Sequence, residues 1–157
     1  MKKKVVIIGG GFAGIQLARN LDDKYFEVLL IDKLNHHQFQ PLFYQVATSQ
    51  IEPSSISFPF RNIFKNNKNI DIRLAVAKHV DTTNKILSTN IGDFSYDYLV
   101  VALGCSTNFF GNKNIANYAL TLKSTYEAIQ IRNHVLTIFE KTLSANDEEK
   151  AALFNLV

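Results

Sequence analysis

The stretch Val5-Val6-Ile7-Ile8-Gly9-Gly10-Gly11-Phe12-Ala13-Gly14 decides the fold. Its four β-branched residues show no polar alternation, which is typical of a strand buried on both faces of a parallel sheet. Glycines interrupt this strand, and apolar residues then recur near helical spacing across residues 13–21. A second apolar run, residues 26–31, ends at Asp32. The order strand, glycine turn, helix, strand predicts one βαβ unit.

The glycines follow the pattern G-x-G-x-x-G. Gly9 permits a tight turn out of the strand, Gly11 lets a pyrophosphate approach the backbone, and Gly14 allows close packing of the helix on the sheet. Free N–H groups at the helix N-terminus would favour the phosphate charge. The pattern therefore predicts dinucleotide binding; the alternative is a purely structural glycine turn. The candidate binding residues here are Gly9, Gly10, Gly11, Phe12, Ala13 and Gly14.

Asp32 stands 18 residues after Gly14, at the end of the second predicted strand. An acid at this place accepts hydrogen bonds from ribose hydroxyls and disfavours a 2′-phosphate, so we expect no NADP here. The alternative is a solvated strand-end residue. Lys33 follows, and it either covers the adenine or is merely exposed.

The rest of the chain predicts a mixture of strands and helices around this unit. Residues 96–103 predict a further buried strand that ends at Gly104. Because ligands of doubly wound sheets lie beyond the carboxyl ends of the strands, Gly104 and Gly9 should border the same crevice. The alternative is an ordinary buried strand that ends at a glycine. The other expected segments are a long loop (33–55), a short helix with Pro59 in its first turn (57–64), an antiparallel hairpin (70–81 with 85–91), a turn-rich stretch (108–117) and the longest helix (124–143).

The loop segment His-His-Gln-Phe-Gln-Pro-Leu-Phe-Tyr-Gln-Val-Ala-Thr, residues 36–48, has two possible roles. Its aromatic and amide side chains, Gln45 among them, could line the edge of a flavin. Alternatively, Phe39, Phe43 and Tyr44 pack into the core. The adjacent histidines have no Cys, His or acid at ligand spacing, so we expect no metal.

Composition narrows the classes of function. The 157 residues suffice for one domain, and the net charge of +3 is too small and too dispersed to indicate nucleic acid. A single cysteine, Cys105, fits a reducing compartment and argues against electron transfer through a protein dithiol. No apolar run approaches the roughly 18 residues of a membrane span, so we expect a soluble or at most peripheral chain.

Three segments together resemble the type II NADH:quinone oxidoreductases, which are non-proton-pumping NADH dehydrogenases. These are residues 5–14, residues 36–48, which are the most specific part, and residues 97–104; the 108–111 turn and residues 122–124 are similar too. The resemblance implies an α/β, Rossmann-like FAD/NAD(P)-binding fold with a parallel sheet and a small antiparallel insertion, here incomplete. It also implies hydride transfer from NADH to FAD and electron transfer to a quinone.

The resemblance assigns roles to individual positions. Gly9 to Gly14 match the FAD pyrophosphate motif, Asp32 and Lys33 the adenosine ribose, and Gly104 a second approach to FAD. Ala77 matches a position whose backbone contacts the adenine. No catalytic residue is expected in this chain.

No second glycine motif follows Gly14. We therefore expect residues 1–152 to form the FAD-binding domain and residues 153–157 to begin a truncated NADH-binding domain. The full-length family would be cytoplasmic and peripheral to the inner face of the cell membrane. The alternatives are a non-catalytic dinucleotide-binding fragment and a truncated remnant.

Overall fold

The computed structural model describes residues 1–154, which fall into two compact units. The first, here called the sheet unit, consists of Met1–Gln38 and Ser57–Cys105. The second, here called the helical unit, consists of Phe39–Ile56 and the chain from Ser106 onward. Each unit has its own buried cluster of apolar side chains.

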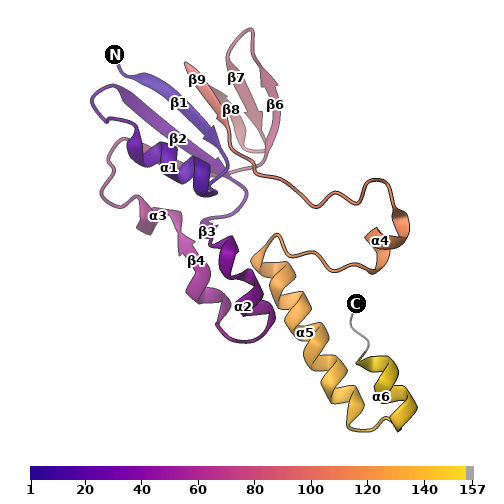
Figure 1. Ribbon diagram of the computed structural model, residues 1–157. Helices are drawn as coiled ribbons and strands as arrows, with labels where there is room; N and C mark the ends of the chain where they lie inside the picture. Colours follow the sequence, from indigo (N-terminus) through magenta and orange to yellow (C-terminus); the bar gives the residue numbers. More distant parts are fainter. Residues whose placement is uncertain (155–157) are drawn as a thin grey trace. The chain divides into compact units, whose positions relative to one another are not determined.

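A four-stranded parallel sheet forms the centre of the sheet unit, in the order β5-β2-β1-β9 (Figure 1). Ile8 at the end of β1 lies opposite both Ile31 and Val101, so the carboxyl ends of three strands are level. Crossover connections of this kind confirm the predicted Rossmann-like α/β fold. The strands are β1 (Lys3–Ile8), β2 (Phe26–Asp32), β5 (Ile70–Leu74) and β9 (Tyr98–Val101).

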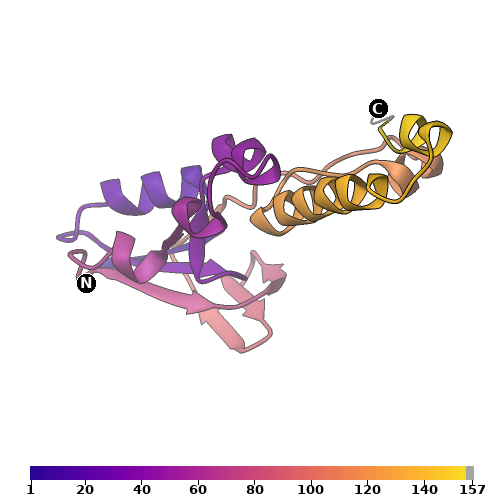
Figure 2. The ribbon, with the colours of Figure 1, turned by 90° about the horizontal axis from the view of Figure 1, so that it is seen from below.

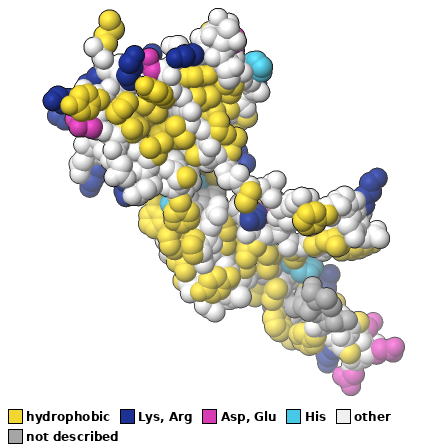
Figure 3. All heavy atoms as spheres, turned by 45° about the horizontal axis from the view of Figure 1, so that its top comes forward, with side chains coloured by type: hydrophobic (Ala, Val, Ile, Leu, Met, Phe, Trp, Pro, Cys, Tyr) yellow, Lys and Arg dark blue, Asp and Glu magenta, His cyan; other side chains and the backbone are white. Residues whose placement is uncertain are grey.

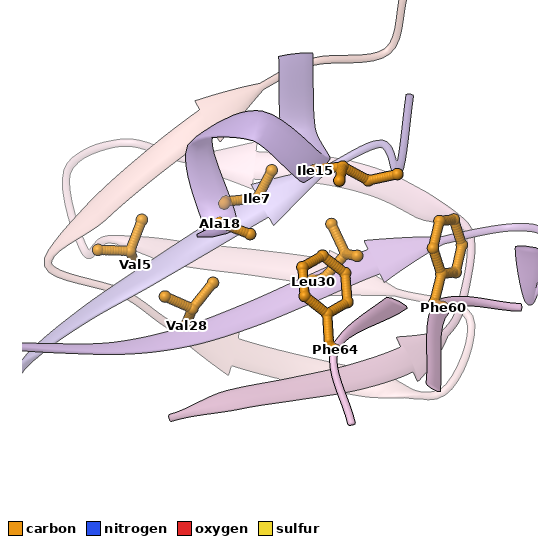
Figure 4. Close-up of a cluster of buried hydrophobic side chains, with 8 residues drawn as sticks. All are labelled: Val5, Ile7, Ile15, Ala18, Val28, Leu30, Phe60 and Phe64. Carbon is orange, nitrogen blue, oxygen red and sulfur yellow. The ribbon is translucent and has the colours of Figure 1, made fainter. Parts of the chain in front are cut away.

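Helices cover one face of this sheet. The odd-numbered positions of β1 point toward α1 (Phe12–Asn20) and toward the short helix α3 (Phe60–Ile63), as strand alternation requires. Figure 4 shows the resulting cluster, in which Phe60 lies near the tips of the strands. Its buried members are Val5, Ile7, Ile15, Ala18, Val28, Leu30, Phe60 and Phe64.

An antiparallel three-stranded sheet packs on the opposite face (Figures 1 and 2). Its strands are β6 (Ala77–Asp81), β7 (Ile86–Thr89) and β8 (Gly92–Ser95). Val6 and Ile8 of β1 meet Leu87 of β7 in a second buried cluster. Strand β1 is therefore buried on both faces, as its unbroken apolar run predicts.

The predicted strand over residues 70–81 is wrong as one element. The structure divides it into β5, which joins the parallel sheet, and β6, which belongs to the antiparallel sheet. Ala75 lies between them, and its N–H donates to the Asp32 carbonyl oxygen at 2.9 Å. The hairpin itself is confirmed for β6 and β7, with Asp81 opposite Ile86. Strand β8 begins shortly after this hairpin, at Gly92.

The predicted helix over residues 57–64 is also partly wrong. Residues Ser57–Pro59 form strand β4, which pairs with β3 (His36–Gln38), and only Phe60–Ile63 are helical. Pro59 is the N-cap of α3 rather than a residue of its first turn. The pairing partner lies about twenty residues earlier, so local sequence carries no signal of it.

The expectation that residues 96–103 are a buried strand is wrong in its burial. Within residues 1–154, strand β9 pairs with β1 alone and forms an edge of the sheet. Accordingly, the side chains of Val101 and Leu103 are 63% and 67% exposed. Hydrophobic side chains are visible on the surface of both units in Figure 3.

The helical unit contains the predicted longest helix, α5 (Thr125–Thr142). Ala128 of α5 packs against Phe43, Val46 and Ile56. The expected loop over residues 33–55 and the turn-rich stretch contain short helices instead. The remaining helices of the unit are η1 (Gln40–Leu42), α2 (Phe43–Ala47), η2 (Pro53–Ile56), α4 (Lys113–Tyr118) and α6 (Asp147–Leu153). The expected start of a further domain at 153–157 falls on the end of α6 and on residues 155–157, which lie outside the described part.

Candidate functional site

The glycine turn between β1 and α1 forms the centre of the candidate site. Gly9 has φ +107°, a backbone conformation that residues with a side chain rarely adopt. A Cβ at Gly9 would also overlap the carbonyl oxygen of Ala102, just beyond β9. The Gly9 N–H donates to the Ile31 carbonyl oxygen at 2.8 Å, so the turn is held between the two neighbouring strands.

Gly14 explains how closely α1 approaches the sheet. A Cβ there would overlap the carbonyl oxygen of Gly9 and come within 3.3 Å of the Ile7 Cγ2 atom. This agrees with the close packing predicted from the pattern. Helix α1 can lie over the turn only because position 14 carries no side chain.

Gly11 differs from these two glycines. A Cβ at Gly11 would have no neighbouring atom within 4 Å, and its φ of −74° suits any residue. It is the N-cap of α1, so no N-cap side chain takes up the first N–H groups of the helix, and the first turn carries no acid. The α-carbon of Gly11 therefore faces open space beside a helix N-terminus, which is where an anion is stabilised.

Asp32 lies at the carboxyl end of β2, beside the glycine turn. Its Oδ2 atom accepts a hydrogen bond from the Gly10 N–H at 2.6 Å, and its Oδ1 atom accepts one from the Leu34 N–H at 2.8 Å. The carboxylate is only half-buried, and Lys33 beside it is exposed. Each oxygen keeps lone-pair capacity for a further donor such as a hydroxyl group.

Two of the other predicted residues belong to the same sheet unit. Gly104 has φ +69° and follows β9, whose parallel partner is β1. The Ala102 N–H donates to the Ile8 carbonyl oxygen at 2.8 Å, so the chain leaves β9 beside the glycine turn. Ala77 is half-buried at the start of β6, with its Cα opposite that of Thr89.

Gln45 lies in α2 of the helical unit. Its side-chain amide donates to the Tyr44 hydroxyl at 3.2 Å. Of the aromatic residues expected in the core, Phe43 is buried at 2% exposure and Phe39 packs against the same cluster, whereas Tyr44 is 52% exposed. Core packing is thus confirmed for the two phenylalanines and wrong for Tyr44.

Sequence reasoning missed two residues, His37 and Phe60, that contact Gly10 in the glycine turn. The Nδ1 atom of buried His37 lies 3.1 Å from the Gly10 carbonyl oxygen. The ring of Phe60 fills the space that a Cβ at Gly10 would occupy. Both residues are far from Gly10 in sequence, so no local pattern could have indicated these contacts.

Residues 1–154 contain no cluster of three or more His, Cys, Asp or Glu residues that could hold a metal ion. In the same part of the chain, no helix is both long enough and apolar enough to cross a membrane.

The sequence profile of the pyridine nucleotide-disulphide oxidoreductase family matches residues 3–141. The chain belongs to this family. The match includes the glycine turn, Asp32 and Gly104. The family name refers to disulphide chemistry. This chain has one cysteine and therefore no pair of thiols for that chemistry.

Individual relatives show which members of this family the chain is similar to. The type II NADH:quinone oxidoreductase Ndh of Mycobacterium tuberculosis is 35% identical over 96% of this chain and 34% of its own length. The mitochondrial external alternative NAD(P)H-ubiquinone oxidoreductase B2 of Arabidopsis thaliana is 32% identical over 99% of this chain and 29% of its own length. The resemblance to type II NADH:quinone oxidoreductases is thereby confirmed, and the chain spans about a third of these relatives.

Solved structures agree with the fold. NDH2 of Plasmodium falciparum in complex with NADH superimposes with a TM-score of 0.85 at 28% identity, covering 96% of this chain and 32% of that one. The sulfide:quinone oxidoreductase of Aquifex aeolicus gives a TM-score of 0.77 at 26% identity, over 88% of this chain and 32% of that one.

Proposed function

We propose that this chain is the FAD-binding part of an NADH dehydrogenase that passes electrons to a quinone. The observation that carries the proposal is the glycine turn, whose one unobstructed position, Gly11, lies at the N-terminus of α1 beside Asp32. Relatives named type II NADH:quinone oxidoreductases support the choice of flavin and of substrates.

The residues present fit FAD. The space in front of Gly11 admits a pyrophosphate, and the helix dipole stabilises its charge. Asp32 would accept the ribose hydroxyls, with Lys33 beside the adenine. The residues assigned to FAD are Gly9, Gly10, Gly11, Phe12, Ala13, Gly14, Asp32, Lys33, Gln45, Ala77 and Gly104.

FAD supplies the hydride-accepting chemistry when it is bound. The residues of this chain bind and orient the cofactor, and none is assigned to proton transfer, to nicotinamide or to quinone. We assign residues 1–152 to the FAD-binding domain and the residues from 153 onward to the start of an NADH-binding domain. The whole protein would act in the cytoplasm, at the inner face of the cell membrane.

Separate titrations with FAD and with NADH test the choice of ligand. We expect FAD to bind, with quenching of flavin fluorescence and a shifted flavin absorbance band. Tight NADH binding without FAD binding would contradict the proposal and indicate a dinucleotide-binding module without turnover.

The proposed electron transfer from NADH through FAD to a quinone is tested on the protein as its gene encodes it. Anaerobic addition of NADH to the FAD-loaded protein should bleach the flavin absorbance, and a quinone should restore it. Flavin that stays oxidised in excess NADH would contradict the assignment as an NADH dehydrogenase.

A further inference from the structure

The peptide between Gly10 and Gly11 lies in the glycine turn directly before α1, where the proposed function places the pyrophosphate. All peptide bonds in the described structure are trans, so the Gly10 carbonyl and the Gly11 N–H lie in one plane and point in opposite directions. Three consecutive glycines place little steric restriction on this plane. Whatever holds the Gly10 carbonyl therefore decides where the Gly11 N–H points.

His37 holds that carbonyl. Its Nδ1 atom lies 3.1 Å from the Gly10 oxygen, and the side chain is buried at 8% exposure. A carbonyl oxygen can only accept, so the hydrogen must be on Nδ1 of the imidazole. The contact requires a hydrogen on Nδ1 and fixes one end of the Gly10–Gly11 peptide plane.

The surroundings keep the imidazole in place. The ring of Phe12, at the start of α1, meets the His37 ring edge to face, with centroids 4.9 Å apart and an interplanar angle of 81°. His37 lies in β3 opposite Phe58 of β4, so its backbone is held by strand pairing. The two-stranded ribbon of β3 and β4 thus holds His37 next to the Gly10 carbonyl.

Phe60, which directly follows β4, contacts Gly10 as well. Its ring, 1% exposed, occupies the space where a Cβ at Gly10 would lie. Figure 4 shows this ring at the strand tips, near Ile15 of α1. The Gly10 N–H meanwhile donates to Asp32 at 2.6 Å. The amide, the α-carbon and the carbonyl of Gly10 are thus each held by a different side chain.

We propose that His37 is a positioning residue for phosphate binding, whose Nδ1–H holds the Gly10–Gly11 peptide so that the Gly11 N–H points away from the ribbon and toward the pyrophosphate. The proposal rests on the proposed binding of FAD. It gives His37 a role distinct from that of its neighbour His36, whose Nδ1 atom lies 3.0 Å from the Asn35 Oδ1 atom.

Three variants separate hydrogen bonding from packing. His37→Leu keeps an apolar side chain of similar bulk but removes the donor, and FAD affinity should fall roughly tenfold, which is the effect of one net hydrogen bond. His37→Asn keeps an N–H donor near the Nδ1 position and should recover most of that loss. His36→Ala, the matched control, should bind FAD as the wild type does.

Affinity is measured by flavin fluorescence, and the folded state of each variant by circular dichroism. His37→Leu that is folded and binds FAD as tightly as the wild type overturns the inference, and so does His37→Asn that binds no better than His37→Leu. A wild-type chain that ignores FAD would instead overturn the proposed function.

A readout that needs neither FAD nor a substitution applies in every case. Long-range proton–nitrogen NMR correlations of the wild-type imidazole distinguish the protonated nitrogen from the bare one. We expect the His37 hydrogen on Nδ1. A neutral His37 with its hydrogen on Nε2 would overturn the inference even if every variant failed to fold.

Discussion

The four glycines of the turn differ in what a side chain would meet. At Gly9 and Gly14 the obstacle is backbone, at Gly10 it is the Phe60 ring, and at Gly11 there is none within 4 Å. Substitutions at these positions should therefore separate the folding of the turn from its binding function. Folding should suffer most where the obstacle is backbone, because backbone cannot move aside cheaply.

Gly14→Ala should lower the free energy of unfolding by about 1–3 kcal/mol, since its Cβ overlaps the Gly9 carbonyl. This loss should outweigh the better helix propensity of alanine, which is worth about 1 kcal/mol. Urea unfolding followed by circular dichroism measures it. Gly11→Ala is the matched control and should unfold like the wild type. A Gly14→Ala variant of undiminished stability would refute the close packing of α1.

Asp97 gives a prediction about pH. Its pKa is lowered from the ordinary value of 3.8, chiefly because its Oδ2 atom accepts the Lys4 N–H at 2.7 Å, with Lys3 also nearby. A carboxylate with a lowered folded-state pKa stabilises the fold above its unfolded pKa and loses this contribution as the pH falls through the folded value.

The stability difference between the wild type and Asp97→Ala should therefore be full near neutral pH and shrink in acid below 3.8. Urea midpoints of both proteins across this range measure the difference. A gap that stays constant into strong acid would show that the carboxylate charge is not what stabilises the start of β9.

At the residue scale, the sequence predicts the reasons for Gly9 and Gly14, because each follows from local turn and helix geometry. The sequence gives no packing reason for Gly10. Phe60 and His37 contact Gly10 because β3 pairs with β4, and these two strands are far apart in the chain. Contacts of that kind leave no periodicity to read.

Among the elements, the βαβ unit and α5 were predictable because their signals are local. The apolar run, the glycines and the helical spacing all lie within the segment they describe. The division of residues 70–81 into β5 and β6 was not, since both halves have strand character and only tertiary pairing separates them.

Helix α5 begins with an N-cap whose value can be measured. The Ser124 side chain accepts the Glu127 N–H at 3.2 Å, so Ser124→Ala should lower the free energy of unfolding by about 1 kcal/mol. Thermal and urea unfolding followed by circular dichroism test this. His134→Ala, at an exposed position of the same helix, is the control and should change stability far less. Equal effects of the two variants would contradict the capping role.

Considered as a whole molecule, the chain consists of two units, of which the sheet unit carries the glycine turn, Asp32, Ala77 and Gly104. Gln45 lies in the other unit. Its assignment to the flavin rests on its amide side chain in the 36–48 segment and not on proximity. The fold class follows from the sequence because parallel strands with crossovers have few arrangements. The burial of β9 does not, because the apolar run of this strand does not by itself distinguish an edge strand from a central one.

A ligand that binds only the folded chain raises its stability by mass action. FAD at about 100 times its dissociation constant should add roughly 2.7 kcal/mol to the free energy of unfolding. The midpoint of thermal unfolding should therefore rise steadily with FAD concentration. A midpoint that does not respond to FAD would contradict binding to the folded state.

The central claim is that phosphate approaches the chain at Gly11, and a titration of FAD into Gly11→Val tests it most directly. Two branched methyl groups should fill the open space without disturbing the fold. Gln16→Val places the same valine side chain on the exposed face of the same helix and serves as the control. We predict that Gly11→Val stays folded and loses flavin binding, while Gln16→Val binds FAD as the wild type does. Wild-type affinity in a folded Gly11→Val variant would contradict the account.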